Sequence, residues 1–298
     1  MNRLRILLLC VIVLAMCGCT KNKSARSVVV PEKPLLVCAT FYPLYIQLLN
    51  ITRNVPGVSL SLLAPANTGC LHDYQLTTKD MRTLESCDIL VVNGAGMEDF
   101  LDKAISLVSS EKTVVASEGF SLVDNNPHVW VSPRGASYQT SRIAEGLSRL
   151  DSTHSDLYAQ NSELYLRQLS ALSDSMHSAL DRYAGASIIT FHEAFPYFAS
   201  EFGLNIVAVI EREAGTEPSA KDLASLVALI RRSQSMHSMV ALFAEPDYAS
   251  SAARVIASET GLSVGELDPA VTGPLEPGAY LAAMERNTAV LEQFLGAP

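Results

Sequence analysis

Residues 153–183 constrain the fold of this 298-residue chain more than any other stretch. Apolar and aromatic side chains recur there at steps of three and four residues, which is the spacing of one helix face. They are Leu157, Tyr165, Leu169, Leu172, Met176 and Leu180, with Asn161 as the polar interruption. A helix of about thirty residues spans roughly 45 Å, more than the width of a small lobe. Because a coiled coil would need a regular heptad and a partner helix, the stretch predicts one long helix that joins two lobes.

Short apolar runs alternate with helical stretches on both sides of this helix. PLLVCATF, VSLSLLAP, DILVVNGAG and KTVVAS precede it, and ASIITFHEAF, LNIVAVIE, MVALFAEPD and LSVGELDP follow it. Apolar strands that alternate with helices predict parallel sheets covered on both faces. We therefore expect an α/β fold of two lobes, each with a mostly parallel sheet flanked by helices. The N-terminal lobe is predicted at 34–150, the connecting helix at 151–183 and the C-terminal lobe at 184–298.

The N-terminus indicates export. MNRLR is basic and ILLLCVIVLAM is an uncharged apolar run, a pattern typical of a signal peptide and too short for a stable membrane span. Gly18 and Cys19 match the end of a bacterial lipobox, which predicts a signal peptide at 1–18 and lipid modification of Cys19. Cys17 is the alternative lipid site, and an uncleaved N-terminal anchor is the alternative to both. Residues 19–33 are polar and predict a flexible tether. The expected location is the extracytoplasmic face of the cell membrane, held by a lipid anchor.

Charge and cysteine usage exclude some classes of protein. The formal net charge is −9, and no basic cluster interrupts it, which argues against a nucleic-acid partner. Cys38, Cys70 and Cys87 follow the tether, and no CxxC motif occurs. The sequence therefore predicts neither a disulfide framework nor a thiolate zinc site, although a bridge between Cys70 and Cys87 stays open.

Polar residues at the strand ends suggest a metal site. His72 in GCLHDYQL and His128 in DNNPHVWVSP belong to the first lobe, whereas His192 in IITFHEAF and Asp268 in GELDP belong to the second. Ligands of such sheets bind outside the carboxyl ends of the strands. Imidazoles and a carboxylate form the ligand set of a four-coordinate, zinc-like site. Each residue alone also fits a structural or solvated role, so the prediction rests on their combination.

The order of these motifs resembles that of the metal-binding lipoproteins of bacterial zinc and manganese ABC importers, the cluster A-I (cluster 9) solute-binding family. The resemblance rests on ATFYPL, GCLHDYQLTTKDM, NGAGMEDFL, NPHVWVSP, FHEAFPYFA, EREAGTEPSAKDL, FAEPDY and TGLSVGELDP. It implies that His72, His128, His192 and Asp268 hold the metal between the lobes. It also implies delivery to an ABC importer permease with its ATPase. Glu245 does not match a ligand position of the family, so we expect it to line the cleft or to orient a ligand histidine. We expect a monomer.

Two features bear on the metal. His192 stands where some family members have a glutamate, and a nitrogen-rich site favours zinc over manganese. In contrast, SEGFSLVDNNPH lacks the long histidine-rich loop that many zinc-dedicated members carry before this motif. Zinc is the predicted metal and manganese is the alternative.

Two other functions are alternatives to import. A zinc hydrolase needs a base beside a metal-bound water, but only Glu193 and Glu245 are candidates, no HExxH motif occurs, and Asp268 would fill the water's position. A surface adhesin on the same scaffold is the other alternative. The sequence therefore predicts a binding protein that is not an enzyme.

Overall fold

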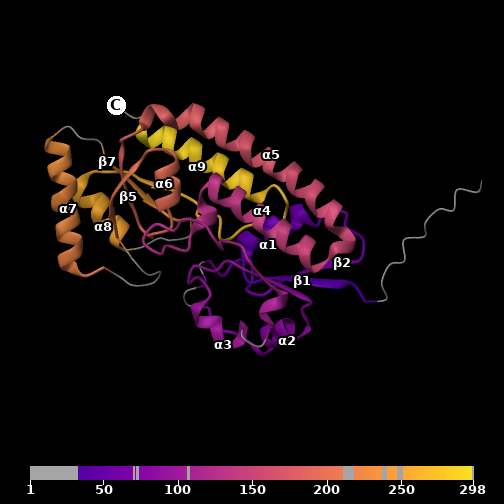
Figure 1. Ribbon diagram of the computed structural model, residues 1–298. Coiled ribbons are helices and arrows are strands. Elements are labelled where there is room, and N and C mark those ends of the chain that lie inside the picture. The colour runs from indigo at the N-terminus through magenta and orange to yellow at the C-terminus, as the bar shows by residue number, and fades with distance from the viewer. Residues whose placement is uncertain are drawn as a thin grey trace, which may run out of the picture. The chain divides into compact units, whose positions relative to one another are not determined.

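Two four-stranded parallel sheets organise the computed structural model (Figure 1). The structure describes residues 33–69, 71, 74–105, 108–210, 218–236, 240–246 and 251–296. The predicted signal peptide, the lipid site Cys19 and nearly all of the tether lie outside the described residues. Both sheets belong to one unit of the chain, Lys33–Pro298.

The first sheet has the strand order β2-β1-β3-β4, with every pair parallel. Its strands are β1 (Leu35–Ala39), β2 (Val58–Leu62), β3 (Ile89–Val92) and β4 (Thr113–Val115). Helices α1 (Tyr42–Ile51), α2 (Thr78–Ser86) and the short α3 (Asp102–Ile105) lie between these strands along the chain. Helix α2 opens with a threonine cap, because the Thr77 hydroxyl accepts the Asp80 N–H and the Asp80 carboxylate accepts the Thr77 N–H.

The second sheet repeats this connectivity in the order β6-β5-β7-β8, again with every pair parallel. Its strands are β5 (Ser187–Thr190), β6 (Asn205–Val209), β7 (Val240–Ala244) and β8 (Val264–Glu266). The helices along this half are α6 (Pro196–Glu201), α7 (Ala220–Ser235), α8 (Ser251–Thr260) and α9 (Ala279–Leu295). The predicted α/β class with two parallel sheets is therefore confirmed.

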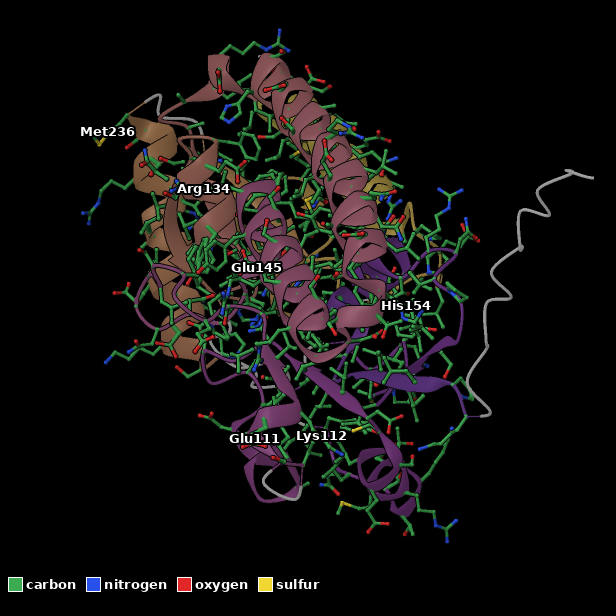
Figure 2. All side chains as sticks on the ribbon, turned by 45° about the vertical axis from the view of Figure 1, so that its right-hand side comes forward. Glu111, Lys112, Arg134, Glu145, His154 and Met236 are labelled. Carbon is green, nitrogen blue, oxygen red and sulfur yellow. The ribbon has the colours of Figure 1, made fainter. Side chains whose placement is uncertain are left out.

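The long helix α5 runs from Ser155 to Leu180, with single 3₁₀ turns at Ser152–His154 and Asp181–Tyr183 at its ends. It packs beside α9 and α4 (Pro133–Leu150), as Figure 1 shows. The predicted apolar face is buried from Tyr165 to Leu180, but Leu157 is exposed. Tyr158 takes the buried place instead, and its hydroxyl donates a hydrogen bond to Asp151. His154 begins this segment (Figure 2), where its ring contacts the same carboxylate.

The hydrophobic core continues from β1 through α4 and α5 to α6 and α9. Trp130 lies in this core, with its ring edge-on to Phe41 at a centroid distance of 5.0 Å. Its indole N–H donates to the Pro269 carbonyl oxygen at 2.8 Å, and its own carbonyl oxygen accepts the Tyr280 hydroxyl at 2.9 Å. These contacts join the first half of the chain to the second and limit any opening between the two sheets.

None of the helices within the described residues has both the length and the apolar composition that crossing a membrane requires. Cys38 and Cys87 are buried free thiols, and burial raises the pKa of both; Cys70 lies outside the described residues.

Candidate metal centre

His128 and His192 face each other at the carboxyl ends of the two sheets. His128 lies in the loop after β4, and His192 is the second residue after β5. Their Nε2 atoms are 3.1 Å apart, and their rings meet edge to face at 84°. Both side chains are buried, with exposed fractions of 0% and 6%. The structure thus brings together one predicted ligand from each half of the chain.

The tautomer of His128 follows from its contacts with Asn126. The amide oxygen of Asn126 accepts the His128 backbone N–H at 2.9 Å, and its Nδ2 donates to the Glu193 carbonyl oxygen at 2.7 Å. These two contacts fix which end of the amide is the oxygen. The same oxygen lies 3.1 Å from His128 Nδ1, so Nδ1 carries the proton and donates it. In the neutral ring, Nε2 of His128 therefore presents a lone pair toward His192.

This pair fits a bound transition metal ion. Two nitrogen atoms bound at about 2.0–2.1 Å to one tetrahedral zinc ion lie about 3.3 Å apart. The observed separation of 3.1 Å between the two Nε2 atoms is close to that value. Ligand histidines usually donate their other ring N–H to an oxygen acceptor, as His128 does to Asn126.

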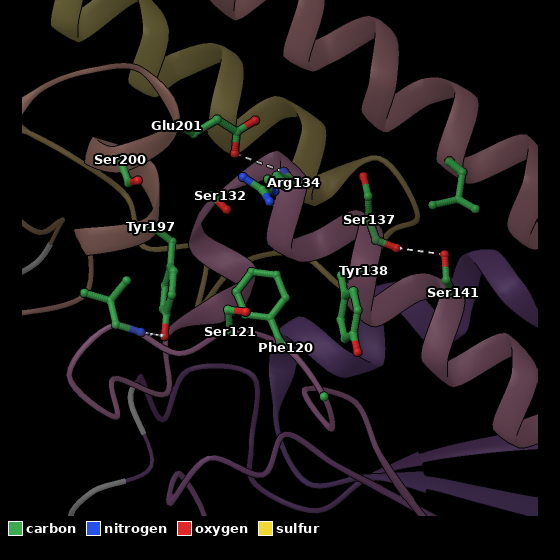
Figure 3. Close-up of a pocket in the computed structure, with 13 residues that line it drawn as sticks. Phe120, Ser121, Ser132, Arg134, Ser137, Tyr138, Ser141, Tyr197, Ser200 and Glu201 are labelled. Carbon is green, nitrogen blue, oxygen red and sulfur yellow. Dashed lines mark hydrogen bonds between the residues drawn. The ribbon is translucent and has the colours of Figure 1, made fainter.

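Tyr197 of α6 forms hydrogen bonds with the loop that carries His128. The Tyr197 hydroxyl donates to the Asn126 carbonyl oxygen at 2.6 Å and accepts the Val123 N–H at 3.1 Å. Figure 3 shows this tyrosine on the wall of a cavity of about 530 Å³, which Phe120 and Tyr138 also line. The side chain of Glu201 at this cavity accepts the Arg134 backbone N–H and the Ser173 hydroxyl. Of these residues, Tyr197 is the one that ties the loop to α6.

Asp268 lies near the start of the loop between β8 and α9, and both of its carboxylate oxygens accept hydrogen bonds. Oδ1 accepts the Ala270 N–H at 2.7 Å, and Oδ2 accepts an Arg286 guanidinium N–H at 2.9 Å. The backbone of Asp268 is clamped by Asn287, which accepts its N–H at 2.7 Å and donates to its carbonyl oxygen at 2.8 Å.

The remaining predicted residues lie as follows. Glu245 comes directly after β7 and is partly buried. His72 lies outside the described residues. Within the described ranges, no three His, Cys, Asp or Glu side chains gather closely enough to hold a metal ion. The described part of the candidate centre is therefore the pair of His128 and His192.

Sequence reasoning missed a buried carboxylate behind the centre. Glu98 accepts hydrogen bonds from the Thr40 hydroxyl at 2.8 Å and from the backbone N–H groups of Asn93 and Gly94 at 2.7 and 2.9 Å. Asn93 in turn donates to the Pro127 carbonyl oxygen at 3.0 Å, next to His128. Burial raises the pKa of Glu98 to about 7, although these hydrogen bonds oppose the shift.

The signal for this carboxylate was a glycine turn followed by a glutamate. Gly94 adopts a left-handed φ of 78°, so the turn in NGAGME aims its backbone N–H groups at the Glu98 side chain. Residues 97–110 follow this turn. The structure has only a 3₁₀ turn at Asp99–Leu101 and the four-residue α3 over the described part of this stretch.

Replacing Asn126 with alanine is expected to weaken metal binding by about tenfold to a hundredfold, because the variant loses the acceptor that fixes the His128 ring. Competitive zinc titration of the purified variant measures this effect. Asn126→Asp, which keeps an oxygen acceptor, is expected to retain more affinity than Asn126→Ala. Equal zinc affinity in the wild type and Asn126→Ala would contradict the positioning role.

The known proteins that this chain resembles in sequence include zinc-binding and zinc-uptake proteins. ZnuA of Bacillus subtilis, a high-affinity zinc uptake system protein, is 27% identical over 273 residues, covering 85% of this chain and 83% of that protein. The zinc-binding lipoprotein AdcA of Streptococcus pneumoniae is 25% identical over 320 residues. That match covers 98% of this chain but 61% of AdcA, so the chain spans less than two thirds of this relative's length.

A solved structure also shares the fold. The SBP FpvC of Pseudomonas aeruginosa, in complex with Ni²⁺, superposes with a TM-score of 0.78 at 26% identity, covering 89% of this chain and 97% of that chain. A family model described as the periplasmic component A of the zinc-uptake complex matches residues 37–294. This match covers most of the chain and includes every predicted metal ligand. The chain therefore belongs to the ZnuA family of zinc-uptake components.

Proposed function

We propose that this chain captures a divalent transition metal ion outside the cytoplasm and hands it to an ABC importer permease with its ATPase. The metal is the cargo. The observation that carries the proposal is the convergence of His128 and His192 Nε2 at 3.1 Å from the two halves of the chain. The relatives named above are zinc-binding or zinc-uptake proteins, and the family supports a binding protein that is not an enzyme.

The proposed ligands are His72, His128, His192 and Asp268, two from each half. His128 and His192 are held on braced loops, and imidazoles bind metal only when deprotonated. Because Trp130, Pro269 and Tyr280 tie the two halves together, capture should need local side-chain movement rather than wide closure. Glu245 is proposed to line the cleft. Cys19 is proposed as the lipid anchor at the extracytoplasmic membrane face, and the protein is proposed to act as a monomer.

Zinc is the favoured cargo. Affinity for nitrogen ligands generally increases from manganese to zinc, and the two described ligand candidates are both imidazoles. A zinc-bound structure exists for the ZnuA-like domain of Streptococcus pneumoniae AdcA, which is 25% identical to this chain. Manganese is the alternative, since FpvC has been solved with Mn²⁺ as well as Ni²⁺.

Elemental analysis of the purified protein, followed by competitive titration with zinc and manganese, tests this function. We expect one tightly held zinc ion per chain, with manganese unable to displace it. Preferential retention of manganese in that competition would change the cargo and leave the site in place. A protein that binds neither ion would contradict the proposed function.

A further inference from the structure

The backbone and the side chain of Asp268 are held by two different residues of α9. Asn287 holds both the N–H and the carbonyl oxygen of Asp268, and the Asn287 side chain is buried, with an exposed fraction of 1%. The carboxylate instead pairs with Arg286, whose side chain is 62% exposed. Asn287 therefore fixes the main chain of this proposed metal ligand, and Arg286 forms an ion pair with its carboxylate.

We infer that Arg286 competes with the metal ion for the Asp268 carboxylate and so lowers the affinity of the centre. This inference rests on the proposed function, because it takes Asp268 as a ligand of the cargo. In the described contacts, Asp268 does not form a metal-binding group with His128 and His192. Since Asn287 fixes the backbone, rotation of the Asp268 side chain is the movement available to reach the ion.

Two physical effects give the competition its direction. The ion pair, at 2.9 Å between Arg286 and Oδ2, must be broken or shared when the carboxylate binds a metal. A guanidinium next to that carboxylate also repels a divalent cation bound to the same group. Both effects oppose metal binding, so removal of the positive charge should strengthen it.

The surroundings of Arg286 let its side chain move away. A cavity of about 240 Å³ lies beside it, lined by Tyr42 and Glu276 among others. Glu276 gives this cavity a carboxylate, and most of the Arg286 side chain already contacts solvent. A released guanidinium therefore keeps its solvation, so the exchange costs little beyond the lost ion pair.

The test is a set of zinc affinities measured by competition with a chelator. Arg286→Gln is expected to bind zinc about tenfold more tightly than the wild type, from the lost ion pair and the lost repulsion. Arg286→Lys keeps the charge and is expected to stay close to the wild type. Arg182→Gln is the matched control, because Arg182 is equally exposed and pairs with Glu292 of α9 at 3.0 Å. It should leave zinc affinity unchanged.

A double-mutant cycle links the effect to Asp268. Arg286→Gln should have a much smaller effect on zinc affinity when Asp268 is already replaced by asparagine, because only the repulsion of the cation is then removed, although Asp268→Asn alone should weaken binding. An unchanged or weaker affinity in Arg286→Gln, with zinc still bound by the wild type, would overturn the competition alone. Failure of Asp268→Asn to weaken binding would overturn the proposed ligand as well. Thermal unfolding of the metal-free variants shows whether any affinity change reflects a damaged fold.

Discussion

Replacing His128 with alanine is expected to lower zinc affinity by about a hundredfold to a thousandfold. Zinc binding to four protein ligands is worth about 10–16 kcal/mol, so one ligand of four accounts for about 2.5–4 kcal/mol. His128 is fully buried, and its Nε2 presents a lone pair toward His192. The same loss is expected for His192→Ala. Competitive titration with a zinc chelator measures both.

The matched control for these variants is His154→Ala. His154 is also a histidine bonded to an oxygen acceptor, but it pairs with Asp151 at the start of α5. Its removal should leave zinc affinity unchanged. An alanine at position 128 leaves a cavity next to Trp130, which lowers the stability of the fold. Thermal unfolding without metal should show that His128→Ala still folds despite this cavity. Wild-type zinc affinity in a folded His128→Ala protein would remove this residue from the proposed centre.

The free energy of unfolding of the metal-free protein is expected to decrease by about 3 kcal/mol through Glu98 as the pH rises from 4.5 to about 7. Because the folded-state pKa of Glu98 lies above its ordinary value of 4.5, the folded protein binds this proton more tightly than the unfolded chain does. The stability is therefore fully present below pH 4.5 and is lost as the pH rises through about 7. Urea unfolding across this range measures the slope.

Glu98→Gln should remove this part of the pH dependence. The amide cannot ionise. Thr40, Asn93 and Gly94 all donate hydrogen bonds to the Glu98 carboxylate, so the amide NH₂ would meet a donor where an acceptor is needed. A loss of about 1–3 kcal/mol relative to the wild type is expected for that reason at pH 4.5, and this difference should shrink as the wild type loses stability toward pH 7. Glu145→Gln is the control, because Glu145, which Figure 2 labels, forms an ion pair with Arg142 at the surface. An unaltered slope in Glu98→Gln would assign the pH dependence to another group.

The sequence was enough to predict the two sheets, because continuous apolar strands separated by helices admit few other arrangements. Helix α4 was not predicted as a separate element. Its buried positions include small or polar side chains such as Ala136, Gln139 and Thr140, so few large apolar residues mark the stretch as a helix. Gly146 shows why: a Cβ there would lie 2.6 Å from the Val114 side chain of β4, so the helix packs where only glycine fits.

The positions of His128 and His192 after predicted strands indicated that they are candidate metal ligands, and the structure places these two in contact. The partners that orient them depended on tertiary packing. Asn126 lies close to His128 in sequence and was visible in the motif, but its bond to the Glu193 carbonyl oxygen depends on how the two halves meet. The pairing of Asp268 with Arg286 joins a loop to a helix on its exposed side, where sequence spacing carries no signal.

The core that continues through α5 has a thermodynamic consequence. When two sheets share buried side chains such as Trp130 and Tyr280, neither can melt without exposing part of the other, so they form one cooperative unit. Free energy gained at a loop of one sheet then protects the other sheet equally. Binding of a single ion would thus stabilise the whole cooperative unit against unfolding, including surfaces far from the histidines.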